Sequence, residues 1–387
     1  MIEKVATNQT VTTLVTELNR QQNNKFDIVS DTRNMRAAVE GGHIVLEIPG
    51  TPGQAEPFRQ PLTYWAHGQL AEKTEIPQTY YRRMQDEEQP ELLASNINTW
   101  MQKKPHKVTV RTLDRNVRAI VSDKFRTLEN RDLAFLTLDC MTKAGAMVVR
   151  ADLSDKHMFI KATTPKMQGE IRVGDIVQGG LLIRNSEVGA SRLAIQPFVN
   201  RLKCANGMVI AEMLGGTGFS QIHLGGSKKA GVYQFSDQTM QLENLAIFSK
   251  IRDVIRQTFE PDWFNQTVAM LKATAENKVP LPERAIGNVV DMAGLSDSTR
   301  DSILRAYLGE PDPTQYGIVQ AVTAVAKAIE SPEDRVSMEE LGGRLAFMPA
   351  QAFTKMAEKP IEPETPRKST KTSTVSAAVQ TLGFWGM

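Results

Sequence analysis

The side chains best suited to chemistry gather in one stretch, residues 179–210, which reads GGLLIRNSEVGASRLAIQPFVNRLKCANGMVI. It places Ser186 between an amide, Asn185, and a carboxylate, Glu187, and it holds one of the two cysteines, Cys204. A nucleophilic serine needs a base that takes its proton, and a reactive cysteine needs a neighbour that lowers its pKa. No histidine or aspartate stands at a spacing typical of such a site, so the stretch shows no known catalytic motif.

A chain reversal explains the same residue types more simply. Asparagine, serine and glycine close turns with their side chains or their backbone freedom. We therefore expect a structural turn or polar site with a second turn close behind it, formed by Asn185, Ser186, Glu187, Gly189, Asn206 and Gly207. The alternative is an enzyme of unknown reaction whose polar pocket is built from Asn185, Glu187 and Arg126. The lack of a catalytic motif favours a protein that is not an enzyme.

Metal and cofactor chemistry has no support in the spacing of residues. The five histidines are scattered, and the two cysteines, Cys140 and Cys204, lie far apart. No dinucleotide-binding or phosphate-binding glycine motif occurs, and the glycine-rich run 215–218 lacks the Lys-Ser/Thr pair of a P-loop. We predict neither a metal site nor a cofactor.

The basic residues form a more informative set. The net charge is only +2, yet residues 101–235 hold 21 Lys and Arg against 11 Asp and Glu. A basic middle between acidic flanks indicates a polyanionic partner. If the basic side chains share one sheet face, they form a groove that follows a phosphate backbone. The candidate nucleic-acid-binding residues are Arg111, Arg118, Lys124, Arg126, Lys161, Arg184, Arg192, Arg201 and Lys203. The alternative is an ordinary solvated sheet face.

Several motifs carry a family resemblance. They are PLTYWA (61–66), IP with YYRRM (76–84), VRAIVSDKFR (117–126), NSEVG (185–189) and CANGM (204–208). Over roughly residues 55–255 the chain resembles a phage- and plasmid-associated family catalogued as domain of unknown function 932. The resemblance implies a mobile-element setting and brings no established activity or catalytic residue. The order of elements in the basic middle also resembles the core of Rad52-like single-strand annealing proteins, in architecture and charge alone.

The elements that must position these residues change type along the chain. Helical periodicity is clear over residues 61–70, 76–84 and 90–102. Alternation then predicts strands at 108–112, 117–122, 146–152 and 157–163, with a helix over 130–143 and two further strands around Leu181–Ile183 and Leu193–Ile195. Six helices follow, over 240–258, 263–276, 283–292, 298–308, 316–329 and 338–356. These patterns predict an α+β protein.

Four parts follow from the changes in pattern. Residues 1–100 are expected to form a largely helical module, 101–235 a basic domain with a mixed or antiparallel sheet, and 236–357 a helical part. Residues 358–387, rich in Pro, Lys, Ser and Thr, should be a disordered tail whose apolar end docks on a partner. No run of about 18 apolar residues occurs, so no membrane contact is expected, and the N-terminus lacks the pattern of a signal peptide. We expect a cytoplasmic protein.

Three functions fit these observations. The first is a nucleic-acid-binding protein of phage or plasmid recombination or replication, which binds or anneals single-stranded DNA as a homo-oligomer. The second is the enzyme with the polar pocket. The third is a structural or regulatory protein that binds other phage proteins through its C-terminal helices. A continuous basic groove would favour the first, and an enclosed pocket at Glu187 would favour the second.

Overall fold

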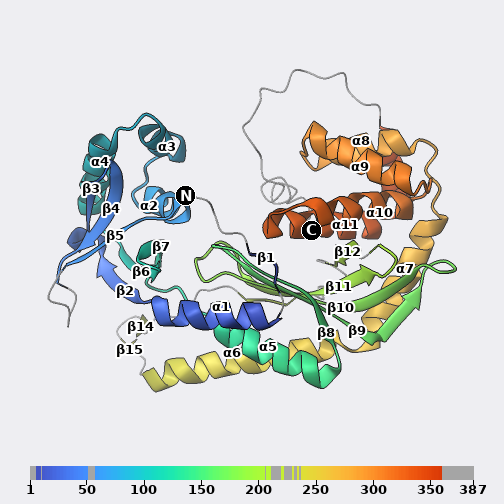
Figure 1. Cartoon of the computed structure of the whole chain (residues 1–387), viewed down its shortest axis with the longest axis horizontal. Helices are drawn as coiled ribbons and strands as arrows, with labels where there is room; N and C mark the ends of the chain where they lie inside the picture. The colour runs from blue at the N-terminus through green and yellow to red at the C-terminus, as the bar shows by residue number, and fades with distance from the viewer. Residues whose placement is uncertain are drawn as a thin grey trace.

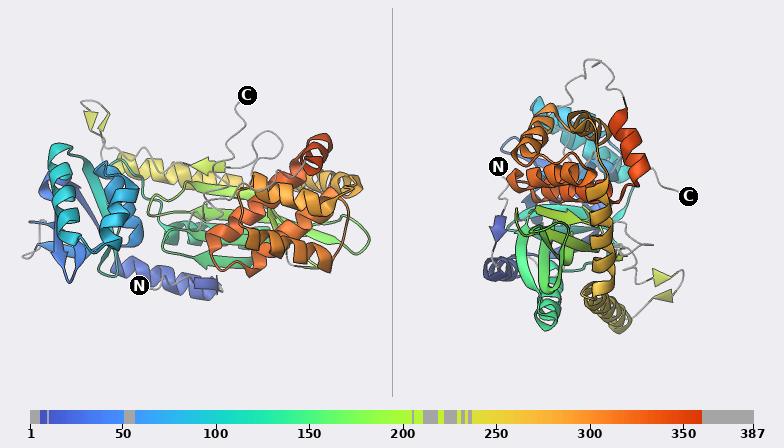
Figure 2. Two further views of the ribbon diagram at one scale, coloured as in Figure 1. Left: turned by 90° about the horizontal axis from the view of Figure 1, so that it is seen from above. Right: turned by 90° about the vertical axis from the view of Figure 1, so that its right-hand side faces the viewer.

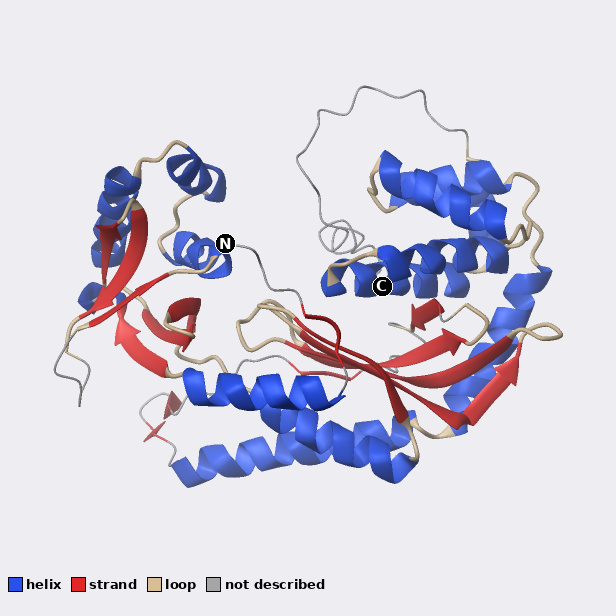
Figure 3. Cartoon of the chain, viewed as in Figure 1, coloured by secondary structure: helices blue, strands red, loops and turns tan. Residues whose placement is uncertain are grey.

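The structure, a computed structural model, describes residues 6–9, 11–50, 57–204, 206–210, 219–221, 229–230, 233–234 and 237–359. It is a mixed helix and strand protein whose strand pairs are antiparallel, so the predicted α+β class is confirmed. The predicted tail lies outside the described residues, apart from Glu358 and Lys359. Figure 3 shows a curved sheet in the middle of the molecule with helices on both of its faces.

The central sheet has seven strands, in the order β1-β8-β9-β10-β11-β12, with β13 also paired to β11. Its strands are β1 (Ala6–Gln9), β8 (Met147–Leu153), β9 (Met158–Glu170), β10 (Ile176–Asn185), β11 (Leu193–Arg201), β12 (Asn206–Val209) and β13 (Phe219–Gln221). The two strands predicted around Leu181 and Leu193 are therefore a hairpin, β10 and β11, in which Ile183 lies opposite Ile195.

The alternation of side chains gives this sheet two different faces. Leu181 and Ile183 join a buried cluster on one face, whereas Leu182 joins a second cluster with Phe159 and Phe198 on the other. Gly180 brings β10 unusually close to β9, because a Cβ atom there would lie 1.9 Å from the carbonyl oxygen of Ala162.

Three helices cover the first face, as Figure 1 shows below the sheet. They are α1 (Val11–Asn24), α5 (Asn130–Ala144) and α6 (Asp237–Thr258). Each places an apolar stripe on the strands, with Leu14 and Leu18 from α1, Leu133 from α5 and Ile251 from α6. Gly145, with φ +68°, ends α5 in the left-handed conformation that glycine adopts most readily.

A separate unit stands at one end of the sheet. It combines a sheet β2-β6-β7, a sheet β3-β4-β5 and three helices around one apolar cluster that draws only on residues 28–120. Its strands are β2 (Asp27–Asp31), β3 (Arg36–Glu40), β4 (His43–Ile48), β5 (Phe58–Pro61), β6 (Lys107–Leu113) and β7 (Asn116–Ser122), and its helices are α2 (Tyr64–Lys73), α3 (Gln78–Asp86) and α4 (Pro90–Lys103). We call it the end unit (Figure 2, left).

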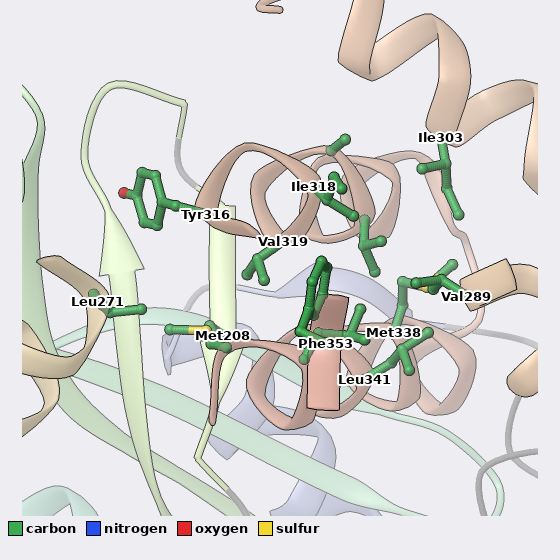
Figure 4. Close-up of a cluster of buried hydrophobic side chains, with 14 of the residues drawn as sticks. Met208, Leu271, Val289, Ile303, Tyr316, Ile318, Val319, Met338, Leu341 and Phe353 are labelled. Atoms are coloured by element: carbon green, nitrogen blue, oxygen red, sulfur yellow. The ribbon is translucent and has the colours of Figure 1, made fainter. Parts of the chain in front are cut away.

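The C-terminal helices cover the second face of the sheet at the opposite end. They are α7 (Pro261–Glu276), α8 (Pro282–Met292), α9 (Asp297–Gly309), α10 (Gln315–Val325), α11 (Pro332–Phe347) and α12 (Ala350–Glu358). Figure 4 shows their shared core, in which Phe353, Leu341 and Val319 pack near Met208 of β12. Gly343 of α11 lies directly on β12, since a Cβ atom there would lie 2.0 Å from the carbonyl oxygen of Val209.

Charged side chains join α11 to the rest of this face. Glu339 pairs with Lys161 of β9, and Arg335 lies 3.1 Å from Asp152 of β8. Glu333 lies 2.9 Å from His157, which precedes β9. The second face of the sheet is therefore covered by a carboxylate-bearing helix.

The packing divides the chain differently from the predicted parts. Residues 107–122, assigned to the basic middle, belong to the end unit, because β6 pairs with β2 and β7. The described part of the module expected to be largely helical holds five strands, β1–β5, besides its helices. Helix α1 and strand β1 pack on the central sheet, and so does α6, which was assigned to the C-terminal part.

Two local predictions are also wrong. Asn206 and Gly207 are not a turn but the first residues of β12, and the turn comes before them, over residues 202–204. The single helix predicted over 338–356 is two helices, because Pro349 lacks the N–H that would continue the first one. Within the described residues, no helix is long and apolar enough to cross a membrane.

Candidate nucleic-acid interface

The turn between β10 and β11 is the point where the end unit meets the central sheet. Asn185 is fully buried, and its side-chain amide donates to the carbonyl oxygen of Leu128 and to the side chain of Asn130, each at 2.8 Å. The hydroxyl of Ser186 accepts a hydrogen bond from the backbone N–H of Ala190 at 2.9 Å. Gly189 completes the reversal with φ +76°. The predicted structural turn is thus present, and its polar groups are used to close it.

Glu187 lies at the centre of a buried charged cluster. One oxygen of its carboxylate accepts from the backbone N–H of Asn130 at 2.6 Å and lies 3.2 Å from Nζ of Lys25. The other oxygen pairs with Arg118. Arg111 donates to the carbonyl oxygen of Glu187 at 2.7 Å.

A second carboxylate, Glu129, completes this cluster. It lies 2.6 Å from Arg111 and also pairs with Lys25, while Arg111 reaches Asp27 at 3.0 Å. Three cations therefore face three carboxylates, and only the outer groups, Asp27 and Glu129, have side chains that are appreciably exposed.

The protonation of the two glutamates follows from their neighbours. Burial disfavours the charged form of Glu187, but Arg118, Lys25 and Arg111 outweigh it and hold its pKa below the usual range. Burial raises the pKa of Glu129, and the negative charge of Glu187 adds to this effect. The carboxylate that carries the charge in the middle of the cluster is therefore Glu187.

This cluster does not have the form of a catalytic pocket. Glu187 is 2% exposed, and protein groups occupy both of its carboxylate oxygens. Arg126, the third residue of the hypothetical enzyme pocket, pairs instead with Glu243 of α6. The structure thus gives the enzyme alternative no support at these three residues, and it assigns Glu187 to holding the two units together.

Most of the predicted nucleic-acid-binding residues form ion pairs with carboxylates of the same chain. This arrangement differs from the exposed groove that we expected. Arg111 and Arg118 belong to the Glu187 cluster. Lys161 and Arg184 face the α11 carboxylates Glu339 and Glu340, Arg126 faces Glu243, and Arg201 lies between Asp175 and Glu310. Lys203 is exposed, but it lies 2.8 Å from Glu310. Each cation has a carboxylate within reach, because the structure needs these charges to join α6, α9 and α11 to the strands.

Lys124 and Arg192 remain exposed, and the structure places both beside the β10–β11 turn. Lys124 precedes Phe125, whose ring lies against Gly189, and Arg192 is the last residue of the connection before β11. Trp65 of α2 reaches the same turn, where its indole N–H donates to the carbonyl oxygen of Val188 at 3.0 Å. Residues far apart in the chain thus meet at this tip.

A third cation and a third aromatic ring complete the surface. Lys156, in the turn between β8 and β9, holds its ammonium 5.6 Å from the centre of the Trp65 ring. Tyr64 is 66% exposed, and the guanidinium of Arg82 lies 3.6 Å above its ring. We define the basic-aromatic patch as Tyr64, Trp65, Lys124, Phe125, Lys156 and Arg192.

The cations of the basic-aromatic patch differ from those of the strands in having no carboxylate partner in the described part of the chain. Among the described residues, no carboxylate lies within ion-pair distance of Lys124, Lys156 or Arg192. Sequence reasoning included two of these three cations but missed Lys156, Tyr64 and Trp65 as site residues. Only the tertiary contact between α2 and two hairpin turns brings these side chains together, so no spacing in the sequence could reveal them.

Other ligands have less support in the described part of the chain. No three His, Cys, Asp or Glu side chains converge there as metal ligands. Comparison with known protein families, with curated proteins and with solved structures finds no match. The predicted resemblance to domain of unknown function 932 rests on the motifs alone.

Proposed function

We propose that this chain binds single-stranded nucleic acid, with single-stranded DNA as the first candidate, through the basic-aromatic patch. Unpartnered cations attract phosphates, and exposed aromatic rings stack on bases of any identity. The observation that carries the proposal is the meeting of Trp65, Phe125 and Lys156 at the β10–β11 turn, where the exposed cations Lys124 and Arg192 are their neighbours in the chain.

The proposal assigns a different role to each kind of side chain. Lys124, Lys156 and Arg192 contact the phosphate backbone. Tyr64, the most exposed ring, stacks on a base, and Trp65 stays fixed by its hydrogen bond to Val188. The Glu187 cluster beneath holds the β10–β11 turn and the end unit in place, so the patch is preorganised.

The test is the salt dependence of binding to a labelled oligothymidylate of about 30 nucleotides. We expect the variant with Lys124→Ala, Lys156→Ala and Arg192→Ala to bind at least about tenfold more weakly at low salt. Its plot of log affinity against log salt should also lose about 2 units of slope, because three phosphate contacts are removed.

The matched control removes the same charge from α6, which covers the first face of the sheet. Lys250, Arg252 and Arg256 are exposed on α6, and changing all three to alanine should leave the slope nearly unchanged. Equal losses of affinity in both variants would show that only the overall charge matters. That result would overturn the assignment of binding to the basic-aromatic patch. No binding of the wild type to single strands at low salt would overturn the function itself.

Two further ligands distinguish the class of nucleic acid. An oligouridylate of the same length tests RNA, and a duplex of the same length tests whether the bases must be unpaired. Because stacking needs open bases, the duplex should bind more weakly than the single strand and should not respond to Tyr64→Ala.

A further inference from the structure

Lys156 of the basic-aromatic patch lies in the turn between β8 and β9, which covers residues 154–157. One hydroxyl group closes this turn. Oγ of Ser154 accepts from the backbone N–H of Lys156 at 3.3 Å and from that of His157 at 3.0 Å. The N–H of Ser154 donates to the carbonyl oxygen of His157 at 2.8 Å. The backbone of Lys156 is therefore fixed by Ser154.

The carboxylate of Glu333 holds the same turn from outside the hairpin. One of its oxygens accepts the hydroxyl proton of Ser154 and lies 2.9 Å from Nδ1 of His157. A hydroxyl group has one proton and two lone pairs. Because the proton of Ser154 goes to Glu333, both lone pairs are left for the N–H groups of the turn.

Glu333 is itself held in place by the start of α11. Ser331 is the N-cap residue of this helix, and its hydroxyl lies 3.4 Å from the second oxygen of the Glu333 carboxylate. The N-terminus of a helix carries a partial positive charge, so a carboxylate in the first turn is favoured there. The helix packs into the C-terminal core through Met338 and Leu341. The turn is therefore supported by a packed element from a distant part of the chain.

The side chain of Lys156 reaches from this turn to the end unit. Its ammonium lies 5.6 Å from the centre of the Trp65 ring on α2. Trp65 is fixed in turn by its hydrogen bond to Val188. A shift of the turn would carry the ammonium away from the ring. The position of this cation in the patch thus depends on the contacts that Glu333 makes.

We infer that Glu333 is a positioning residue for nucleic-acid binding, which acts through Ser154 and His157 on Lys156. The inference rests on the proposed function, because it concerns a cation of the same patch. Glu333 does not touch the nucleic acid. It keeps one phosphate-binding ammonium beside an aromatic ring, so less ordering of that long side chain is left to occur on binding.

The sign of one substitution separates this role from simple electrostatics. A carboxylate near the patch repels phosphates, so Glu333→Gln would strengthen binding if charge alone mattered. If Glu333 positions Lys156, the same change weakens binding. A loss of affinity in a folded Glu333→Gln variant therefore has no explanation in the change of charge.

The test measures binding of the labelled oligothymidylate against salt concentration. Lys156→Ala should bind about threefold more weakly at low salt and lose about 0.7 units of slope, the value of one phosphate contact with a single strand. Glu333→Gln should show the same two losses. The double variant should lose no more than Lys156→Ala does, whereas independent effects would multiply to about ninefold.

Asp334→Asn is the matched control. It removes the same charge from the next residue of α11, whose Oδ1 has no hydrogen-bond partner among the described residues, so binding should be unchanged or slightly tighter. Ser154→Ala serves if Glu333→Gln does not fold, because it removes the hydroxyl that links the carboxylate to the turn. It should also weaken binding about threefold and add nothing to Lys156→Ala. Melting curves show which variants are folded at the temperature of the assay.

The outcomes separate the inference from the proposed function. If the wild type binds and folded Glu333→Gln binds equally or more tightly, the inference is overturned and the proposed function stands. The same result for Ser154→Ala overturns it where Glu333→Gln is unfolded. Additive losses in the double variant also overturn it, because Glu333 would then act on something other than Lys156. No binding of the wild type would overturn the proposed function and the inference together.

Discussion

The carboxylate of Glu187 lies 2.6 Å from the backbone nitrogen of Asn130, the first residue of α5. The N-terminus of a helix leaves N–H groups unsatisfied and carries a partial positive charge, so a buried carboxylate there is well placed. The same side chain pairs with Arg118 of β7. One residue of a hairpin turn therefore joins the central sheet, the helix beneath it and the end unit.

Replacing Glu187 with glutamine should destabilise the protein strongly. Arg118 would stay buried without its charge partner, while Lys25 would keep only Glu129, and breaking a buried pair in this way costs about 3 kcal/mol. Thermal and denaturant unfolding measure the loss. The exposed Glu72 provides the control, and Glu72→Gln should leave the melting midpoint unchanged. Equal midpoints for both variants would contradict the central role of the cluster.

Acid should weaken the contact between α11 and the sheet. Burial opposes the charge of Glu333, but hydrogen bonds from His157 and Ser154 outweigh it and lower its pKa to about 2. Burial lowers the pKa of His157. Both groups bind protons more readily in the unfolded chain, so each contributes stability that is lost as the pH falls.

The pH windows of the two groups differ. Stability linked to Glu333 is fully present above its ordinary pKa of 4.5 and is lost as the pH falls toward about 2. The loss linked to His157 begins below its ordinary value of 6.5. Denaturant unfolding from pH 7 to 3 should show a shallower decline for Glu333→Gln than for the wild type. Parallel curves would refute this assignment.

Gly180→Ala should be among the most damaging small substitutions. The added Cβ atom would lie 1.9 Å from a backbone oxygen of β9, and a strand in the middle of a sheet cannot move aside without breaking its pairing. We expect a loss of about 3 kcal/mol, at the upper end for overpacking. Gly309→Ala is the matched control, because nothing lies within 4 Å of that position. A stable, normally melting Gly180→Ala protein would contradict the close approach of β9 and β10.

The structure indicates how far the chain can be shortened from its C-terminus without loss of stability. The side-chain amide of Asn288 donates to the carbonyl oxygens of Met356, Ala357 and Lys359, so α12 is held up to its last residue. A chain that ends at Lys359 should melt within about 2 °C of the full chain. A chain that ends at Thr354 loses the buried Ala357 and the partners of Asn288. Its melting midpoint should fall clearly below that of the chain that ends at Lys359. Similar midpoints for the two truncations would show that this end of α12 contributes nothing.

The sequence predicts those elements whose signal is local. The helices α2 to α5 and the hairpin β10–β11 follow from periodicity and turn residues over short windows, and they are where we expected them. The pairing of β6 with β2 has no such signal, because alternation shows that a strand exists and not which strand lies beside it. The predicted assignment of β6 and β7 to the central domain is wrong for this reason.

The site was harder to predict for a related reason. The strand pattern placed Arg111, Lys161 and Arg201 on or beside strands, but only the folded chain shows that the carboxylates of Glu129, Glu339 and Glu310 face them. Lys156 and Trp65 lie 91 residues apart in the sequence and meet through two separate turns. Composition indicates that basic residues are abundant, and tertiary packing decides which of them stay free.

The end unit is inserted between α1 and α5, so two chain crossings attach it to the central sheet instead of one. These crossings lie close together, since Lys25, which follows α1, pairs with Glu129, which precedes α5. A double tether resists twisting, which a single linker would permit. It also means that the unit could be excised, and its two cut ends joined by a short connector, without changing the order of the remaining strands. During synthesis, α1 is made before the end unit, whereas its packing partner α5 is made after the end unit. About a hundred residues must therefore be synthesised after α1 before α5 can bury its apolar face.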